Sequence, residues 1–439
     1  MGGTDKGNGD SSLMRNREYR WWFAADTSLQ AGALVGGFAF TLLGYTVTRD
    51  YTLSGLAGTL NTLVQALMVI PGGAIADRFD RRLLIVGSGA CAAVLDVAVV
   101  VLLALGWMTT PVLMMVALGS GVLSGLFVNV TDVALPQVVD GSRLAEATAA
   151  NQSRDALLQL VASPLSGMLY GVSAALPFAV AALLRMVQSL SGAALRTDLR
   201  PRRMPADRDG NEPVVADLHG TDDVPPADAS SPDGLGEGAR WYLRNGDALV
   251  VQLLIVVQMM ALGMCGMSIV LDQQSMGTPS WMLGGIQSCQ GLGMMAGALV
   301  MMRVLSRLDG RALFTVTSLM FVACFAATAF THDPCILAVL GFCASTPLIP
   351  LNAMLSTYVA LLVPNDLRGR VDAVGTLLVS MASGVASVAA GMLLDRFGYR
   401  MAVLLPLAIL SIATMAACRT QAIRRMPGLS RMEEIAPVA

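Results

Sequence analysis

Lysine is almost missing from this chain of 439 residues, whose 29 basic residues include one lysine, Lys6, and are otherwise arginines. A Walker A phosphate-binding loop needs Gly-Lys followed by Ser or Thr, so the sequence excludes an ATP-driven pump built on this chain alone. The two histidines, His219 and His332, cannot form the His-x-x-x-His pair of a metalloprotease. Because no catalytic constellation is present either, we expect no enzyme activity, no cofactor and no bound metal.

Charged and aromatic residues are also scarce. Only 14% of the residues are charged and 5% aromatic, while 54% are hydrophobic and the mean hydropathy is +0.62; soluble domains carry about 25% charged residues. The seven cysteines lie mostly in apolar runs without Cys-x-x-Cys spacing, which is typical of small buried hydrophobic residues. Most of the chain therefore has no water to face, and its environment is expected to be a lipid bilayer with no nucleic acid partner.

Apolar runs long enough to cross a bilayer recur along the chain. A helix needs about 20 apolar residues for this, and the sequence predicts an all-α membrane protein with twelve transmembrane helices in two pseudo-symmetric six-helix bundles. The predicted spans are 21–48, 53–76, 83–106, 111–135, 151–170, 174–195, 248–271, 281–302, 311–331, 334–362, 371–394 and 399–418. Pro347 and Pro350 predict a kink in the tenth span.

The arginines give an independent test of this topology. Arg49, Arg396 and Arg400 fall in loops after odd-numbered spans, and all the others fall at the termini, in or beside loops after even-numbered spans, or in adjoining helix ends. Positive residues collect on the cytoplasmic side of membrane proteins. Both termini are therefore expected in the cytoplasm.

The chain divides into two halves. We expect a cytoplasmic segment at 1–20, a bundle at 21–196, a cytoplasmic linker at 197–247, a second bundle at 248–418 and a cytoplasmic tail at 419–439. Asp, Pro and Gly dominate the linker to about residue 236, which is typical of disorder. Gly73 matches Gly297, and Gly167-Met168-Leu169 matches Gly391-Met392-Leu393, both at an offset of 224 residues. Such duplication is typical of secondary transporters, whose substrate binds between the repeats.

A charged motif ends the second span, from Gly73 to Arg82. Gly73 would allow close helix approach, and Asp77 could cap a neighbouring helix or pair with an arginine. We interpret it as a cytoplasmic latch that forms in one state and separates in the other; the alternative is that its arginines only anchor the topology. The latch residues are Gly73, Asp77, Arg78, Arg81 and Arg82. A related segment, from Gly391 to Arg400, lies at the opposite face.

The stretch from Gly73 to Arg82 resembles the Gly-x-x-x-Asp-Arg-x-Gly-Arg-Arg loop of the major facilitator superfamily, with Asp80 in place of the motif's second glycine. Segments around 135–147, 163–167, 237–245 and 367–371 resemble the enterobactin-exporter and macrolide-efflux branch. Ser163-Pro164-Leu165-Ser166-Gly167 is similar to the antiporter motif Gly-Pro-x-x-Gly-Gly, so Pro164 and Gly167 are expected to bend the fifth span. The resemblance implies a monomer in a bacterial inner membrane.

Ionisable groups inside spans are costly and usually functional. The candidates for proton coupling are Asp26, Asp96, Asp132, Arg154 and Asp155. Loss of water favours the neutral form of a carboxylate, which suits Asp26 to carrying a proton; the alternative is a helix N-terminal carboxylate near the interface. A polar contact is the alternative for Asp96. Arg154 and Asp155, expected about one turn from the cytoplasmic end of their helix, favour interhelical ion pairs.

A substrate cavity is predicted from amides and methionines within the spans. Met260, Met264 and Met267 share one face of the seventh span, and thioethers suit varied apolar ligands, although packing is the alternative. The predicted cavity residues are Asn61, Gln65, Asn151, Gln258, Met260, Met264, Met267, Gln287 and Gln290.

The resemblance implies alternating-access export of a small amphipathic molecule, such as a drug or siderophore-like compound, in exchange for protons. Uptake or facilitated movement of a nutrient or lipid remains open. A receptor or scaffold that has lost transport remains open as well.

Overall fold

The computed structural model describes residues 13–128, 130–139, 143–196, 232–303, 310–364 and 367–420. The described residues form helices and turns, with no strand among them. The first half contains η1 (Leu13–Arg15), α1 (Arg17–Thr48), α2 (Tyr51–Arg78), α3 (Arg81–Ala104), α4 (Thr110–Phe127), α5 (Val130–Val138), α6 (Leu144–Val172) and α7 (Leu176–Ala194). The second half contains α8 (Pro232–Arg244), α9 (Gly246–Ser275), α10 (Ser280–Arg303), α11 (Gly310–Thr328), α12 (Pro334–Ser345), α13 (Leu348–Leu362) and α14 (Arg368–Ala417).

Each of the twelve predicted spans is helical. Helices α4 and α5 together form the fourth span, and α12 and α13 form the tenth, which breaks at Pro347 as its prolines predict. The eleventh and twelfth spans are the two parts of α14, which meet at Gly398 with φ 73° and ψ 176°. This left-handed conformation suits glycine. By length and composition alone, eight helices of the described chain could cross a membrane.

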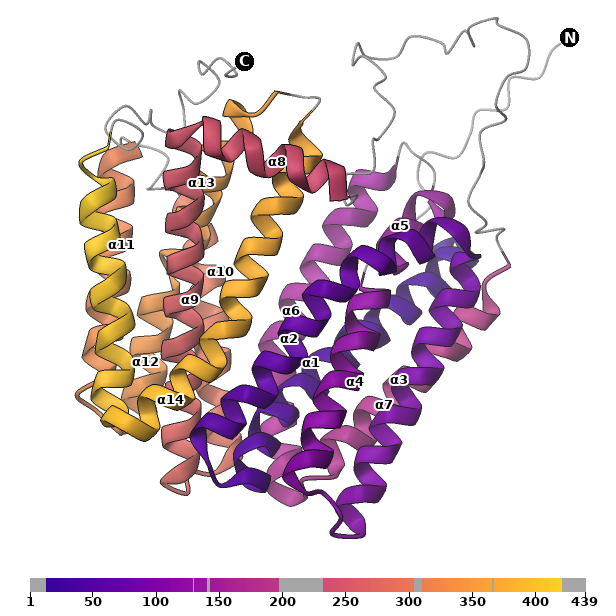
Figure 1. Ribbon diagram of the computed structural model, residues 1–439. Coiled ribbons are helices and arrows are strands. Elements are labelled where there is room, and N and C mark those ends of the chain that lie inside the picture. Colours follow the sequence, from indigo (N-terminus) through magenta and orange to yellow (C-terminus); the bar gives the residue numbers. More distant parts are fainter. Residues whose placement is uncertain are drawn as a thin grey trace, which may run out of the picture.

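The helices form two bundles, α1 to α7 and α8 to α14, which stand side by side (Figure 1). We call the end where α1 begins and α2 ends the basic end, and the opposite end the far end. Side chains cap the helices at both ends. Asn16 accepts hydrogen bonds at the start of α1, Asp50 at the start of α2, and Asp80 at the start of α3. These caps satisfy backbone N–H groups that have no partner within their helix.

Helix α8 lies within the segment predicted as linker, whose residues 197–231 are outside the described ranges. Its Trp241 and Tyr242 are buried, and Glu237 forms an ion pair with Arg370 of α14. The Tyr242 hydroxyl donates to Oε1 of Gln252 at 3.2 Å. Burial, with a further contribution from Asp372, raises the pKa of Tyr242 to about 12. The hydroxyl therefore stays protonated and keeps its hydrogen bond to Gln252. Together with the buried aromatic residues and the ion pair, this bond holds α8 across the basic end of the second bundle (Figure 1).

The bundles meet in their far-end halves, where α2 packs on α14 and α6 on α10. A buried cluster in this half joins Phe38 and Leu42 of α1 to Val270 of α9 and Leu283 of α10. In the basic-end half there are two buried clusters. One, around Trp22 and Leu135, lies within the first bundle, and the other, around Trp241 and Leu355, lies within the second. The described bundles are thus packed together at the far end and separate at the basic end.

Four glycines of the described helices mark the meeting points, among them Gly167 and Gly391. A Cβ atom on Gly167 of α6 would lie 2.3 Å from the Ser280 carbonyl oxygen, and one on Gly391 of α14 would lie 2.2 Å from that of Tyr51. These distances are too short for any side chain. Gly167, which the sequence predicts to bend its helix, therefore serves as a point of close approach between bundles, as its matched partner Gly391 does.

Two hydroxyl groups join the same helix pairs. Ser288 of α10 donates to the Leu160 carbonyl of α6 at 2.8 Å. That carbonyl lacks its usual helical donor because the residue four positions later is Pro164. In the other pair, Thr59 of α2 donates to the Gly384 carbonyl at 2.6 Å and accepts from the Val388 N–H at 3.1 Å. Its hydroxyl is thus inserted into a backbone hydrogen bond of α14.

These paired contacts fix the register of the repeats. Leu160 and Pro164 match Gly384 and Val388 at the offset of 224 seen for Gly167 and Gly391. Thr59 and Ser288, however, differ by 229. The predicted match of Gly73 with Gly297 is therefore wrong. Gly73 faces open space, and its neighbour Gly72 makes the close approach, 2.6 Å from Cβ to the Leu126 carbonyl oxygen.

Candidate functional site

A buried ion pair links α1 and α6. Nη2 of Arg154 lies 2.6 Å from Oδ2 of Asp26, whose side chain is 2% exposed, and 2.7 Å from Oδ1 of Asp155. The guanidinium also donates to the Thr27 hydroxyl at 3.3 Å and lies 5.1 Å from the centre of the Phe23 ring. Oδ1 of Asp26 is buried and has no hydrogen-bond partner among the described residues. One carboxylate oxygen of Asp26 is thus paired, and the other is unpaired within the described part of the chain.

The cluster lies deeper than the sequence predicts. Helix α6 begins at Leu144, so Arg154 stands in its third turn and not about one turn from its end. Asp132 of α5 is exposed and interacts electrostatically with Asp26 and Arg154. Nε1 of Trp22 donates to the neighbouring Thr131 carbonyl at 2.9 Å and so joins α5 to α1. Four of the five predicted coupling residues therefore gather at one place.

Asp96, the fifth, lines a separate cavity of about 360 Å³, which is bounded mainly by the first bundle and also by Met267 and Ser387 of the second. Asn61, Gln65 and Met267 line the same cavity, and so does Arg185 of α7, which interacts electrostatically with Asp96. A smaller space of about 140 Å³ adjoins it and shares Gln65, Ser124 and Arg185. Polar side chains of α1, α2, α3, α4, α7 and α14 thus line a cavity between otherwise apolar helices.

The other predicted cavity residues lie elsewhere. Met264 is buried against Ala386 and Ala390 of α14, and Met260 packs on the same cluster. Gln258 is buried near Phe314 inside the second bundle. The methionine face therefore mainly holds α9 to α14. Three further residues lie outside the cavity: Gln290 contacts Gly341 of α12, Gln287 is partly exposed on α10, and Asn151 is buried on α6.

The predicted latch lies at the basic end. Asp80 caps α3 by accepting from the Arg82 N–H at 2.9 Å, and the Arg82 side chain donates to the Ala193 carbonyl of α7. The Asp77 side chain lies outside the described part, so the latch stays a prediction. In the related far-end segment, Asp395 accepts from the Thr52 N–H at 2.9 Å. An aspartate of the second bundle thus caps α2 of the first.

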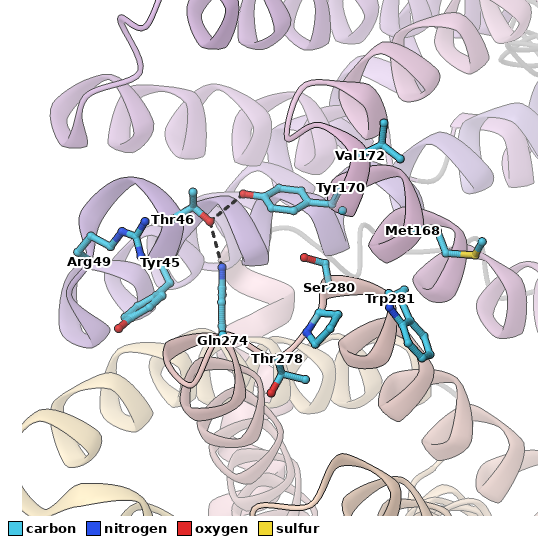
Figure 2. A pocket seen from close by; sticks show the side chains of 13 residues that line it. Tyr45, Thr46, Arg49, Met168, Tyr170, Val172, Gln274, Thr278, Ser280 and Trp281 are labelled. Atoms are coloured by element: carbon cyan, nitrogen blue, oxygen red, sulfur yellow. Dashed lines mark hydrogen bonds between the residues drawn. The ribbon is translucent and has the colours of Figure 1, made fainter.

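A pocket of about 730 Å³ opens at the far end, between α1, α6, α9 and α10 (Figure 2). Tyr170 donates to the Thr46 hydroxyl at 2.9 Å, and Gln274 donates to the same oxygen at 3.1 Å. Gln274 also donates to the Leu42 carbonyl at 2.6 Å. The two bonds of Gln274 cross from α9 to the first bundle and add to the closure of this end, whereas the Tyr170 bond joins α6 to α1 within the first bundle.

Arg185 is the residue that the sequence analysis missed. It stands in the middle of α7, an apolar helix whose described length is Leu176–Ala194. The signal was present, since a single arginine inside an apolar run is costly and usually functional. The topology argument grouped Arg185 with the arginines at helix ends, so its position in the middle of the helix was not recognised.

Twelve helices in two duplicated bundles, with charged and amide side chains held inside them, define a secondary-transporter class of membrane protein. The family model described as the Major Facilitator Superfamily matches residues 27–378. The chain belongs to the Major Facilitator Superfamily, a family of transport proteins.

Solved structures share its fold at low sequence identity. The D323A mutant of the nucleoside transporter NupG has 10% identity and a TM-score of 0.70, covering 90% of this chain and 98% of that one. A bacterial homolog of the human lysosomal transporter Spinster, in an inward-facing and unoccupied conformation, has 14% identity and a TM-score of 0.72, covering 95% and 98%. A D-xylose-proton symporter has 11% identity and a TM-score of 0.62, covering 97% and 98%. No curated protein matches the chain.

Proposed function

We propose that the chain exports small amphipathic molecules in exchange for protons, by alternating access between its two bundles. The observation that carries this proposal is the ion pair between Asp26 and Arg154, buried between α1 and α6. Protonation of Asp26 would weaken its attraction to Arg154 and loosen the contact between the two helices. A proton could therefore bias one packing of the bundles over the other, which is what coupling requires.

The direction of transport rests on two arguments. The concentration of arginines at the basic end supports a cytoplasmic location for that end, and the bundles are separate there, so this conformation would receive substrate from the cytoplasm. The resemblance of several segments to the enterobactin-exporter and macrolide-efflux branch supports export. Proton-linked uptake is the alternative, because solved neighbours include a nucleoside transporter and a D-xylose-proton symporter.

The test uses purified protein in liposomes with an imposed pH gradient and a panel of amphipathic compounds. Asp26→Asn should reduce gradient-driven flux to the level of protein-free liposomes, because the amide cannot take up a proton, while equilibrium binding of the transported compound persists. Asp247→Asn, which alters an exposed carboxylate in the first turn of α9, is the control and should transport normally. Undiminished gradient-driven flux in Asp26→Asn would refute the coupling role.

A further inference from the structure

Arg185 is held inside the first bundle without a partner at bonding distance. Its Nε is buried and makes no hydrogen bond with any described residue. Asp96 interacts with it electrostatically across the cavity, but no carboxylate of the described chain lies within the 4 Å of an ion pair. The guanidinium lines both the 360 Å³ cavity and the adjoining 140 Å³ space. It therefore stands where the two spaces meet.

A largely desolvated cation without a paired anion lowers stability, since loss of its hydration is not compensated. Neighbouring helices nevertheless leave room for this one. A Cβ atom on Gly32 of α1 would lie 3.3 Å from Nε of Arg185, so a larger residue there would crowd the side chain. An unpaired charge with space kept around it is typical of a binding group whose partner is a ligand.

The lining around Arg185 suits a polar group attached to an apolar body. Gln65 and Ser124 line both spaces, and Gln30 lines the smaller one, so amide and hydroxyl donors surround the guanidinium. Phe40, Val99 and Phe178 line the far part of the larger cavity. An arginine fork binds a carboxylate through two parallel hydrogen bonds.

We propose that Arg185 binds an anionic group, with carboxylate as the preferred form, on the amphipathic molecule that this chain transports. The proposal rests on the proposed function in taking this cavity as the transport site. Among the described residues, Asp96 is the only carboxylate that lines the larger cavity. When ionised, it attracts the same guanidinium and repels the anion, so it competes with the ligand. Removal of the Asp96 charge and removal of the Arg185 charge must then have opposite effects on anion affinity.

The experiment compares 2-naphthoate with 2-naphthamide, which have the same ring system and differ in charge. Dissociation constants come from the rise in unfolding temperature of the full chain, followed with a thiol-reactive dye that labels buried cysteines such as Cys265 on unfolding. Detergent without added phospholipid excludes anionic headgroups. The wild type should bind the carboxylate about 10- to 100-fold more tightly than the amide, the range expected for hydrogen bonds to a charged group.

Arg185→Gln should abolish this preference, and Asp96→Asn should increase it. Arg185→Lys, which keeps the charge and is available should the glutamine variant fail to fold, should retain a weaker preference. The matched control is Arg49→Asn, which removes an arginine from the far-end pocket at a left-handed position, φ 52°, that asparagine tolerates. It should keep the full preference.

Equal affinity of the wild type for the two compounds would overturn the proposal, and so would a preference that survives in Arg185→Gln or disappears in Arg49→Asn. Loss of the preference in both Asp96→Asn and Arg185→Gln would indicate a structural pair instead. Binding is measured without a gradient, so this result is separate from the coupling test. Asp26→Asn should keep the carboxylate preference even when it no longer transports.

Discussion

Arg154 compensates two carboxylates at once, and one of them, Asp26, is almost fully buried. Removing one partner of a buried ion pair leaves the other charge uncompensated, which costs about 3–5 kcal/mol in soluble proteins. Arg154→Gln should therefore lower the unfolding temperature strongly. Asp26→Asn combined with Arg154→Gln should recover much of the loss, because no unpaired charge then remains between α1 and α6.

Thermal unfolding of the two single variants and the double variant gives the coupling between the residues. Arg143→Gln is the control, because its ion pair with Glu146 lies at the surface and should contribute about 0–1 kcal/mol. Additive effects of the two buried substitutions would contradict the coupling described for Asp26 and Arg154.

The rarity of charge in the spans was enough to find Asp26, Arg154 and Asp155 from the sequence. It could not tell which of the rare charges meet, since that depends on how α1, α5 and α6 pack. The neighbours of the methionines could not be predicted for a related reason. Helical spacing identifies the shared face of Met260, Met264 and Met267, but the neighbour of that face is set by the tertiary fold, and it is α14.

At the scale of the helices, the hydroxyl contacts of Ser288 and Thr59 between the bundles differ in which backbone groups would lose their hydrogen-bond partners on mutation. Ser288→Ala leaves the Leu160 carbonyl without a donor, because Pro164 has no N–H. An unpaired buried acceptor costs about 1–3 kcal/mol, so this variant should favour separation of α6 from α10. Thr59→Val should have a smaller effect, since the Gly384 carbonyl and the Val388 N–H can bond to each other within α14.

Spin labels at Trp107 and Phe330, exposed far-end residues of different bundles, would report the separation as a longer distance. The double variant Ser288→Ala, Pro164→Ala should restore the shorter distance, because the backbone N–H at position 164 can then donate to the Leu160 carbonyl. Ser411→Ala, which removes a hydroxyl bonded within its own helix, should change nothing. Equal effects of Ser288→Ala and Thr59→Val would show that the proline is irrelevant.

Hydropathy predicts helices well in this chain because a bilayer demands long apolar runs with internal backbone bonding. Prolines add to this prediction, since those of the tenth span indicated its break at Pro347. Helix α8 was not predicted, because its Trp241 and Tyr242 follow a segment whose Asp, Pro and Gly content is typical of disorder.

For the whole molecule, the far-end closure requires that four glycines between the bundles stay without side chains: Gly55, Gly167, Gly284 and Gly391. Gly391→Ala places a Cβ 2.2 Å from the Tyr51 carbonyl oxygen, and such overpacking costs about 1–3 kcal/mol. The variant should populate conformations with the far end open and transport slowly. The same spin-label distance and the liposome flux measure both effects. Gly171→Ala, on α6 with open space around it, should match the wild type; an unchanged distance in Gly391→Ala would contradict the role of this contact.

The junction at Gly398 has a mechanical consequence. The last two spans meet there at a single residue, with no loop to absorb movement between them. Any tilt of the first part of α14 must therefore pass directly into the second part, which reaches Leu410 and Ala417 in separate buried clusters. A shift that begins at α2 should therefore also move the second part of α14, on the opposite side of the second bundle.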